Sequence, residues 1–322
     1  MNVATALGLT AGVAVAVGLI AWNGVGPVVG LLGTGGIGLL LVPLFHLVPI
    51  LATTLAWRSL LRARGVRQPI GRLGWYRWLG DSINALLPVA QVGGEVVRGQ
   101  LLARCGGVAG GTAAASVIVD LTLGLATLVA FVLGGLSLML GRGDPAAAPL
   151  VLGTVLFCLP VAAFYRLQRS GLPLRLARAL AARLGGAGWQ RLAGGAGTLD
   201  HELAALYARP AALARSAGWR LAAWIAGALE MALGLAILGH AIGLGDALIF
   251  EAVTQAFRNA GFAIPAALGV QEGGMMVAGA LIGVPAELAL TLSLVKRMRD
   301  LVLGLPALTV WQVQESRRLW RR

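Results

Sequence analysis

The chain has 322 residues, of which 58% are hydrophobic and only 12% are charged. A soluble domain carries roughly 25% charged residues, so this composition excludes a soluble globular protein. The formal net charge of +13 comes almost entirely from arginine, because Lys296 is the single lysine. Most arginines lie between apolar segments, where the positive-inside rule places them in membrane proteins. The charge therefore does not indicate nucleic-acid binding.

Six apolar segments are long enough to cross a bilayer, which takes about 20 residues. We expect them at about 4–22, 37–57, 111–140, 147–165, 219–243 and 286–313. No basic residue precedes the first segment, so we expect a retained span and not a cleaved signal peptide. The sequence predicts an all-α integral membrane protein that forms one polytopic domain over residues 1–322.

Two further apolar segments, 73–104 and 247–283, are interrupted by proline and glycine. They share an Asn, a Pro and a Glu in that order, at Asn84, Pro88 and Glu95 in the first and at Asn259, Pro265 and Glu272 in the second. The expected helix breaks are Pro88, Gly93, Gly94, Pro265, Gly269, Gly273 and Gly274. Because irregular backbone at bilayer depth is tolerated only inside protein or beside water, we expect two re-entrant broken-helix segments.

Arginine-rich loops determine the expected orientation. The loop 58–72 holds five arginines and is predicted to be cytoplasmic, so the first re-entrant segment starts and ends at that face. The stretch 166–218 is predicted to form cytoplasmic amphipathic helices on the membrane surface. Following the spans in order, the second re-entrant segment starts outside, near Asp246 and Glu251, and both termini are cytoplasmic. Re-entrant segments from opposite faces are typical of an inverted-topology repeat with a transport site at its centre.

Glu95 and Glu272 are the leading site candidates, because an ionisable group at bilayer depth costs about 2.5–3.5 kcal/mol and needs a role. Two interpretations are open. The carboxylates line a cavity and handle a proton or a polar headgroup, or they cap the broken helices by accepting backbone N–H groups. Each is followed 25 residues later by a charged residue, Asp120 after Glu95 and Arg297 after Glu272.

The last span carries four charged residues near its middle: Lys296, Arg297, Arg299 and Asp300. The three cations are candidates for holding a lipid phosphate, and Lys296 has the spacing for an ion pair with Asp300. The alternative is a surface turn between two short helices. Asp120 is predicted to balance one of these cations, in a structural or a transport role.

Other polar residues near the breaks complete the candidate site: Asp81, Asn84, Gln91, Arg98, Arg258, Asn259 and Gln271. Arg98 is expected to pair with Glu95, and Arg258 either guards the outer mouth or extends its charge to the membrane surface. The amides line the cavity or bond backbone groups freed at the breaks. Glu230 has weaker support, and His46 is expected to be a core histidine. No metal spacing, phosphate loop or nucleophile motif occurs, so we predict no cofactor, no metal and no enzyme activity.

These motifs carry a family resemblance. The run from Ala263 to Gly274 resembles the Pro-Gly-x-x-Gly-x-x-Glu-Gly signature of the flippase-like transmembrane region of lysylphosphatidylglycerol synthases, and the run from Asn84 to Arg98 resembles its partner motif. The resemblance covers essentially the whole chain and is closest to the hopanoid-biosynthesis-associated subgroup HpnL. Two positions depart from the signature, since Ala266 replaces a glycine and Gln271 replaces an arginine.

The resemblance implies a bacterial inner-membrane protein that moves a lipid between leaflets, with a hopanoid as the suggested cargo. It implies membrane lipids as partners, either a hopanoid or an anionic phospholipid, and other lipid-biosynthesis proteins of the membrane. The expected function is a lipid flippase or transporter that works through a polar cavity between inverted repeats. The alternatives are a membrane-embedded transferase acting on lipid headgroups and a non-catalytic scaffold of hopanoid biosynthesis.

Overall fold

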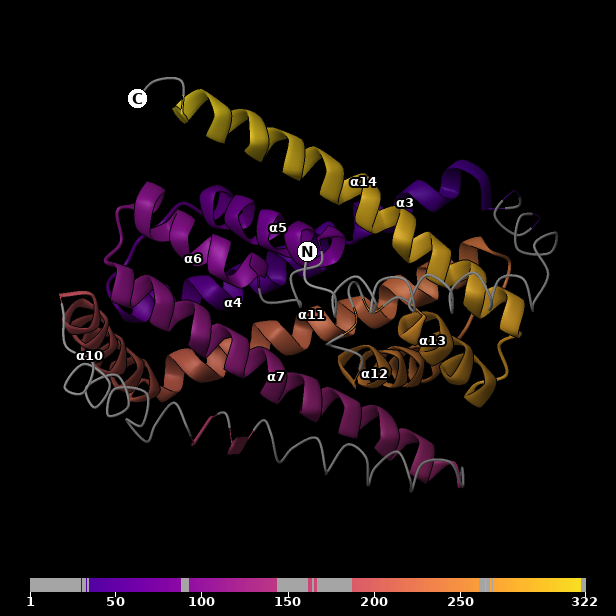
Figure 1. The fold of residues 1–322 in the computed structure, drawn as a ribbon. Helices are drawn as coiled ribbons and strands as arrows, with labels where there is room; N and C mark the ends of the chain where they lie inside the picture. Colours follow the sequence, from indigo (N-terminus) through magenta and orange to yellow (C-terminus); the bar gives the residue numbers. More distant parts are fainter. Residues whose placement is uncertain are drawn as a thin grey trace.

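The computed structural model describes residues 35–87, 93–143, 187–260 and 269–319, together with a few isolated positions. Throughout these four ranges the secondary structure is helical and no strand occurs (Figure 1). The expected all-α class is confirmed for this part of the chain.

Three helices are long and apolar enough to cross a bilayer. The first runs over Gly36–Ala63 through η1 (Gly36–Leu40), α3 (Leu41–Phe45) and α4 (Leu47–Ala63). The others are α7 (Gly110–Gly141) and α11 (Pro210–Ile237). Helices capable of spanning a membrane therefore occur at three of the expected positions, 37–57, 111–140 and 219–243. The spans expected at 4–22 and 147–165 lie almost entirely outside the described residues.

The helix α11 begins nine residues earlier than the span expected there. Residues 210–218, which were expected to belong to a surface stretch, form its first turns, while α10 (Ala187–Tyr207) is a separate helix. Pro210 suits the first turn, where its missing N–H is not needed. Further along, Arg220 is buried because it contacts the carboxylate of Asp120. Residues 210–218 are therefore continuous with α11, and the surface location of the stretch stays a prediction.

The last helix, α14 (Ala286–Leu319), continues without interruption through residues 296–300. The alternative of a surface turn between two short helices is therefore wrong. Lys296 and Arg299 are buried, although α14 is not among the helices that hydropathy alone marks as membrane-spanning. Its charged residues lower the hydropathy, and each finds a carboxylate partner or lies beside one inside the bundle.

Each interrupted segment folds into two helices that pack against each other. The first hairpin consists of α5 (Ile70–Leu86) and α6 (Gly93–Gly106), and the second of α12 (Leu244–Ala260) and α13 (Val270–Leu281). The expected breaks Pro88 and Pro265 fall between these helices and lie outside the described residues. Figure 1 shows the hairpins at opposite ends of the long helices, the first toward α10 and the second at the far end of α7.

Contacts at the open end of each hairpin agree with this placement. Gln68, just before α5, donates a hydrogen bond of 2.7 Å to the carbonyl of Gly106 at the end of α6. At the other end of the bundle, Arg142 after α7 pairs at 2.5 Å with Asp246 at the start of α12. The two hairpins therefore open toward opposite ends of the helix bundle.

The glycines expected to break the helices have different roles in the structure, and some of them stand at helix ends. Gly93 and Gly94 begin α6, and Gly94 lies against Gly80 of α5 so closely that a Cβ atom would collide with the carbonyl oxygen. Gly269 precedes α13 at φ 78°, a conformation that favours glycine. Gly273 and Gly274 lie within α13, so the breaks expected at these two positions are wrong. The small size of Gly274 instead serves packing, since a Cβ there would meet Phe257 at 2.5 Å, whereas a Cβ at Gly273 would meet no atom within 4 Å.

The helices pack in the same order in two halves of the chain. In the first half a long helix (η1–α4) is followed by a hairpin (α5–α6) and by α7, and in the second half α11 is followed by α12–α13 and α14. The helix α5 packs against α14, and correspondingly α12 packs against α7. The two leading helices, α4 and α11, pack along each other and run antiparallel, because His46 contacts Glu230 while Ser59 shares a groove with Arg215.

The outside of the bundle is strongly apolar. Many large apolar side chains are exposed, among them Leu44, Leu51, Ile225, Leu305 and Val310. Exposed apolar surface of this extent marks an interaction or membrane surface. A separate set of charged residues is buried inside, around a cavity between the helices.

Candidate functional site

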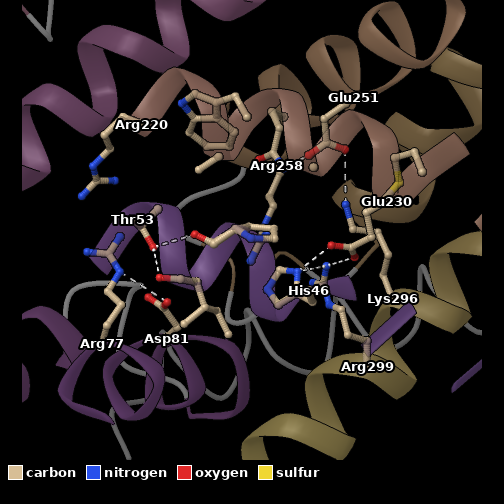
Figure 2. A pocket seen from close by; sticks show the side chains of 17 residues that line it. His46, Thr53, Arg77, Asp81, Arg220, Glu230, Glu251, Arg258, Lys296 and Arg299 are labelled. Atoms are coloured by element: carbon tan, nitrogen blue, oxygen red, sulfur yellow. Dashed lines mark hydrogen bonds and ion pairs between the residues drawn. The ribbon is translucent and has the colours of Figure 1, made fainter. Parts of the chain in front are cut away.

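A cavity of about 190 Å³ lies among five helical segments from both halves of the chain. Its charged and imidazole lining comes from the start of α4, from α5, from α11, from α12 and from α14 (Figure 2). These lining residues are His46, Arg77, Asp81, Arg220, Glu230, Glu251, Arg258, Lys296 and Arg299. The interior of this bundle is therefore polar where the helices of the two halves meet.

Asp120 of α7 organises one side of the site. Its fully buried carboxylate contacts three guanidinium groups from three other helices, those of Arg77 (2.8 Å), Arg98 (2.8 Å) and Arg220 (2.5 Å). Arg98 also pairs with Glu95, its Nε lying 2.6 Å from the Glu95 carboxylate, as the spacing of these two residues predicted. The carboxylate of Asp120 thus joins α7 to α11 and to both helices of the first hairpin through charge-assisted hydrogen bonds.

Glu230 of α11 organises the opposite side. Its carboxylate lies 2.5 Å from Nη1 of Arg299 and 2.6 Å from Nδ1 of His46. Arg299 bonds in addition to its neighbour Asp300 at 2.7 Å, and its Nη1 lies 3.1 Å from the same ring nitrogen of His46. This cluster connects the start of α4 with α11 and α14.

Two further carboxylate–cation pairs join the second hairpin to α14. Glu251 of α12 lies 3.4 Å from Lys296, and Glu272 of α13 accepts a 3.0 Å bond from Nε of Arg297. Glu272 also accepts the backbone N–H of Gly269 at 2.7 Å. Glu272 therefore caps its helix, as the second interpretation expected, and also pairs with Arg297.

Several predicted partners differ in the structure. Asp120 does not balance the cations of α14, because it lies beside arginines of the first hairpin and of α11. Lys296 pairs with Glu251 and not with Asp300, which instead pairs with Arg299. The reason is the same in each case. Every one of these cations contacts a different carboxylate, which belongs to another helix or to the adjacent residue in the chain. The three cations of α14 are therefore not free to clamp a phosphate together.

The predicted site residues fall into two groups. Arg258, Lys296 and Arg299 line the cavity. Glu95 and Glu272 are absent from its lining and instead accept hydrogen bonds from Arg98 and Arg297. A second set supports the hairpins: Asn84 accepts the N–H of Gly94 at 2.8 Å, Asn259 donates to the carbonyl of Gln255, and Gln271 is buried in α13. Gln91 lies outside the described residues.

Sequence reasoning missed several lining residues. Arg77 and Arg220 were not singled out, and Glu251 was placed near the outer start of the second re-entrant segment although only 3% of it is exposed. His46 was expected to be an ordinary core residue. For Arg77, Glu251 and His46 the available signal was position, since each lies at least a full turn inside an expected apolar segment, where an ionisable group needs a partner.

The fold and this site define a multi-pass helical membrane protein whose core holds a charged cavity. Residues 9–307 match the model of the family described as the lysylphosphatidylglycerol synthase TM region, so the chain belongs to that family. This confirms the family resemblance, and the family indicates a lipid-related function in the membrane. Comparison with curated proteins and with solved structures found no match.

Proposed function

We propose that the protein moves a lipid between the two leaflets of the membrane, with the lipid headgroup passing through the charged cavity. The observation that carries this proposal is a polar cavity inside a bundle of helices whose outer surface is apolar. Arg220 and Glu230 both line it and lie about 15 Å apart along α11, at 1.5 Å per residue. The two residues are therefore separated along the helix by about half the thickness of a hydrocarbon core, which is roughly 30 Å.

The arrangement of the helices supports an inverted-topology repeat around this cavity. Each half supplies a long helix, a broken hairpin and a second long helix, and the hairpins open toward opposite ends of the bundle. Transporters commonly bind substrate where two such repeats meet, near the middle of the membrane. In this proposal both hairpins are re-entrant segments, and the end that carries α10 and the arginines after α4 faces the cytoplasm.

Ion pairs between the halves offer a means of alternating access. Arg220 of the second half contacts Asp120 of the first, and His46 of the first half contacts Glu230 of the second. Movement of one half against the other must break these ion pairs. A polar headgroup that supplies new partners lowers the free-energy cost of breaking them. The family resemblance suggests a hopanoid or a phospholipid as the cargo, in the inner membrane of a bacterium.

The test is lipid translocation in proteoliposomes, with a labelled hopanoid and a labelled phospholipid. We compare the wild type with Glu251→Gln, which removes a cavity charge, and with Asp246→Asn, a matched change near the exposed start of the same helix. We expect transport by the wild type and by Asp246→Asn, and a loss of at least tenfold in Glu251→Gln, because Lys296 loses its carboxylate.

Folded wild-type protein that moves neither lipid would contradict the proposal. Transport unaffected by Glu251→Gln would place the path away from this cavity. Mass analysis of the recovered lipids separates translocation from chemistry, because a headgroup transferase changes the mass of its lipid and a transporter does not.

A further inference from the structure

A second cavity, which we call the terminal groove, lies at the end of the bundle that carries α10 (Figure 1). Its lining comes from the end of α4, within residues 59–63, and from the junction of α10 with α11, within residues 208–215. Its volume is about 490 Å³, inside the range of roughly 300–1,000 Å³ that is typical of ligand pockets. Among the described residues, none lines both this groove and the central cavity. The two are separated along α4 by about 9 Å, from Thr53 to Ser59 at 1.5 Å per residue.

Three arginines line the terminal groove: Arg62 of α4, Arg209 just before α11, and Arg215 in the second turn of α11. Among the residues that the structure describes, no carboxylate lies within ion-pair distance of any of the three. Arg64 provides the contrast, because it follows Arg62 by two residues and bonds both oxygens of Glu202, at 2.9 and 3.0 Å. The rest of the groove's lining is uncharged. The groove thus gathers three positive charges without a described countercharge.

The start of α11 adds to this positive charge. Unpaired backbone N–H groups give a helix N-terminus a partial positive charge, which attracts anions and disfavours nearby cations. Arg209 is the N-cap residue of this 28-residue helix, and Arg215 follows within its second turn. Two cations therefore stand where the helix itself disfavours them. A bound anion relieves the repulsion among the guanidinium groups and their repulsion from the helix end.

The positive-inside rule explains why arginines occur at this end of the bundle, but it does not explain why they converge on one groove. Arg62 and Arg215 belong to different halves of the chain and meet only because α4 and α11 pack antiparallel. Arg67, by contrast, is exposed beyond the end of α4 and is absent from the lining of the groove. Convergence of cations from separate elements favours recognition of one ligand.

We infer that the terminal groove binds the phosphate of a phosphomonoester through Arg62, Arg209 and Arg215. Guanidinium groups match phosphate oxygens in a bidentate geometry. A phosphomonoester carries about 1.5 to 2 negative charges at pH 7, whereas a phosphodiester carries one, and three cations beside a positive helix end favour the higher charge. The bound phosphate joins α4 of the first half to α11 of the second. This inference goes beyond the proposed function, because the groove is separate from the cavity proposed to pass the headgroup.

Two sources supply this chemistry at a membrane surface: a lipid whose headgroup is a phosphomonoester, as in phosphatidic acid, and a soluble phosphate. At the groove α4 ends and α11 begins, and both belong to helices that are long and apolar enough to cross a bilayer. The ends of such helices lie at the level of the lipid headgroups. The position of the groove therefore favours the lipid.

The test titrates the wild-type chain in detergent at pH 8 by calorimetry. The probes are short-chain phosphatidic acid, short-chain phosphatidylcholine as the zwitterionic control, and inorganic phosphate as the soluble source. We expect phosphatidic acid to bind at least about tenfold more tightly than phosphatidylcholine, because several charge-assisted hydrogen bonds form only with its phosphomonoester.

The variants locate the binding. Arg62→Gln and Arg215→Gln should each weaken phosphatidic acid binding by about ten- to a hundredfold, the loss expected for a hydrogen bond to a charged group. Arg67→Gln removes the same charge at the same end of the bundle but outside the groove, and it should leave the affinity unchanged. All three arginines are exposed, so we expect the variants to fold, with elution and tryptophan fluorescence as the check.

The inference is overturned if neither phosphatidic acid nor inorganic phosphate binds. It is also overturned if Arg67→Gln weakens binding as much as Arg62→Gln does, since the overall charge of this end then explains the affinity. Binding that survives both Arg62→Gln and Arg215→Gln places the phosphate elsewhere and has the same consequence. Inorganic phosphate that binds as tightly as phosphatidic acid, and is lost in Arg62→Gln, supports the site and assigns it a soluble anion.

These outcomes differ from failure of the proposed function, which is measured as lipid movement in proteoliposomes. A chain that moves lipid but shows no phosphate binding dependent on Arg62 keeps translocation and loses only the terminal site. Binding dependent on Arg62 in a chain that moves no lipid contradicts translocation alone.

Discussion

Asp120 is a fully buried carboxylate that contacts arginines from three helices. A single buried charge of this kind would be expelled from the core or neutralised. Here its partners arrive from α5, α6 and α11, and Arg98 also lies 4.8 Å from the centre of the Trp57 ring. Removing the carboxylate would leave three buried guanidinium groups with too few acceptors, which is more costly than losing the contacts themselves.

We expect Asp120→Asn to lower the free energy of unfolding by about 3–5 kcal/mol, the range measured when one partner of a buried pair is removed. The measurement is unfolding in mixed micelles, followed by tryptophan fluorescence. Asp246→Asn is the matched control, because the same substitution there affects an exposed pair with Arg142, where about 0–1 kcal/mol is expected. If Asp120→Asn lowers the free energy of unfolding no more than Asp246→Asn does, the arginines around Asp120 find other hydrogen-bond acceptors and the prediction is wrong.

Sequence spacing predicted part of this site. The pairing of Glu95 with Arg98 follows from their separation along one helix. The contacts of Asp120 and of Glu230 were not predictable in this way. They join residues that lie at least 22 positions apart in the chain, and helical periodicity does not determine how one helix is rotated against another.

At the scale of the elements, α5 and α6 approach each other through glycine. A Cβ atom at Gly94 would collide with the carbonyl oxygen of Gly80, whereas one at Gly99, later in α6, would meet only a methyl group of Val117 at 3.5 Å. Two glycines of one helix thus have opposite requirements. Gly94 allows close contact between the two helices of the hairpin, and Gly99 contributes no such contact.

We expect Gly94→Ala to destabilise the protein by about 1–3 kcal/mol, because the added methyl group pushes α5 and α6 apart. Gly99→Ala should be neutral or stabilising by up to about 1 kcal/mol, since alanine has the higher helix propensity. Both changes are measured by the same unfolding assay. Equal effects of the same sign would mean that helix propensity, and not the close approach, determines the role of Gly94.

The breaks at the hairpin tips were predictable because proline and glycine interrupt an apolar run, and α5–α6 and α12–α13 occur where these interruptions stand. The individual roles of the glycines were not. Gly94 and Gly274 serve close packing against residues of the neighbouring helix, Gly80 and Phe257, and such contacts depend on the crossing point of two helices. Composition shows that a glycine is present but not which surface it faces.

At the scale of the whole molecule, the two halves repeat one order of elements, and each hairpin packs on the last long helix of the other half. Trp78 of α5 donates a 3.0 Å bond to the carbonyl of Leu303 in α14, while Gly135 of α7 lies against Ala252 of α12. This exchange of hairpins surrounds the cavity with helices from both halves. An inverted repeat therefore places the open ends of the hairpins on opposite sides of the membrane.

Single cysteines test this prediction in a background with Cys105 and Cys158 replaced by serine. Arg72→Cys marks the open end of the first hairpin, and Asp246→Cys marks that of the second. In intact cells, a membrane-impermeant thiol reagent should label the cysteine at position 246 and spare the one at 72. After permeabilisation it should label both, because each position is then reachable. Labelling of both in intact cells would place both hairpins on the same side and contradict the inverted repeat, whatever the cargo of the cavity.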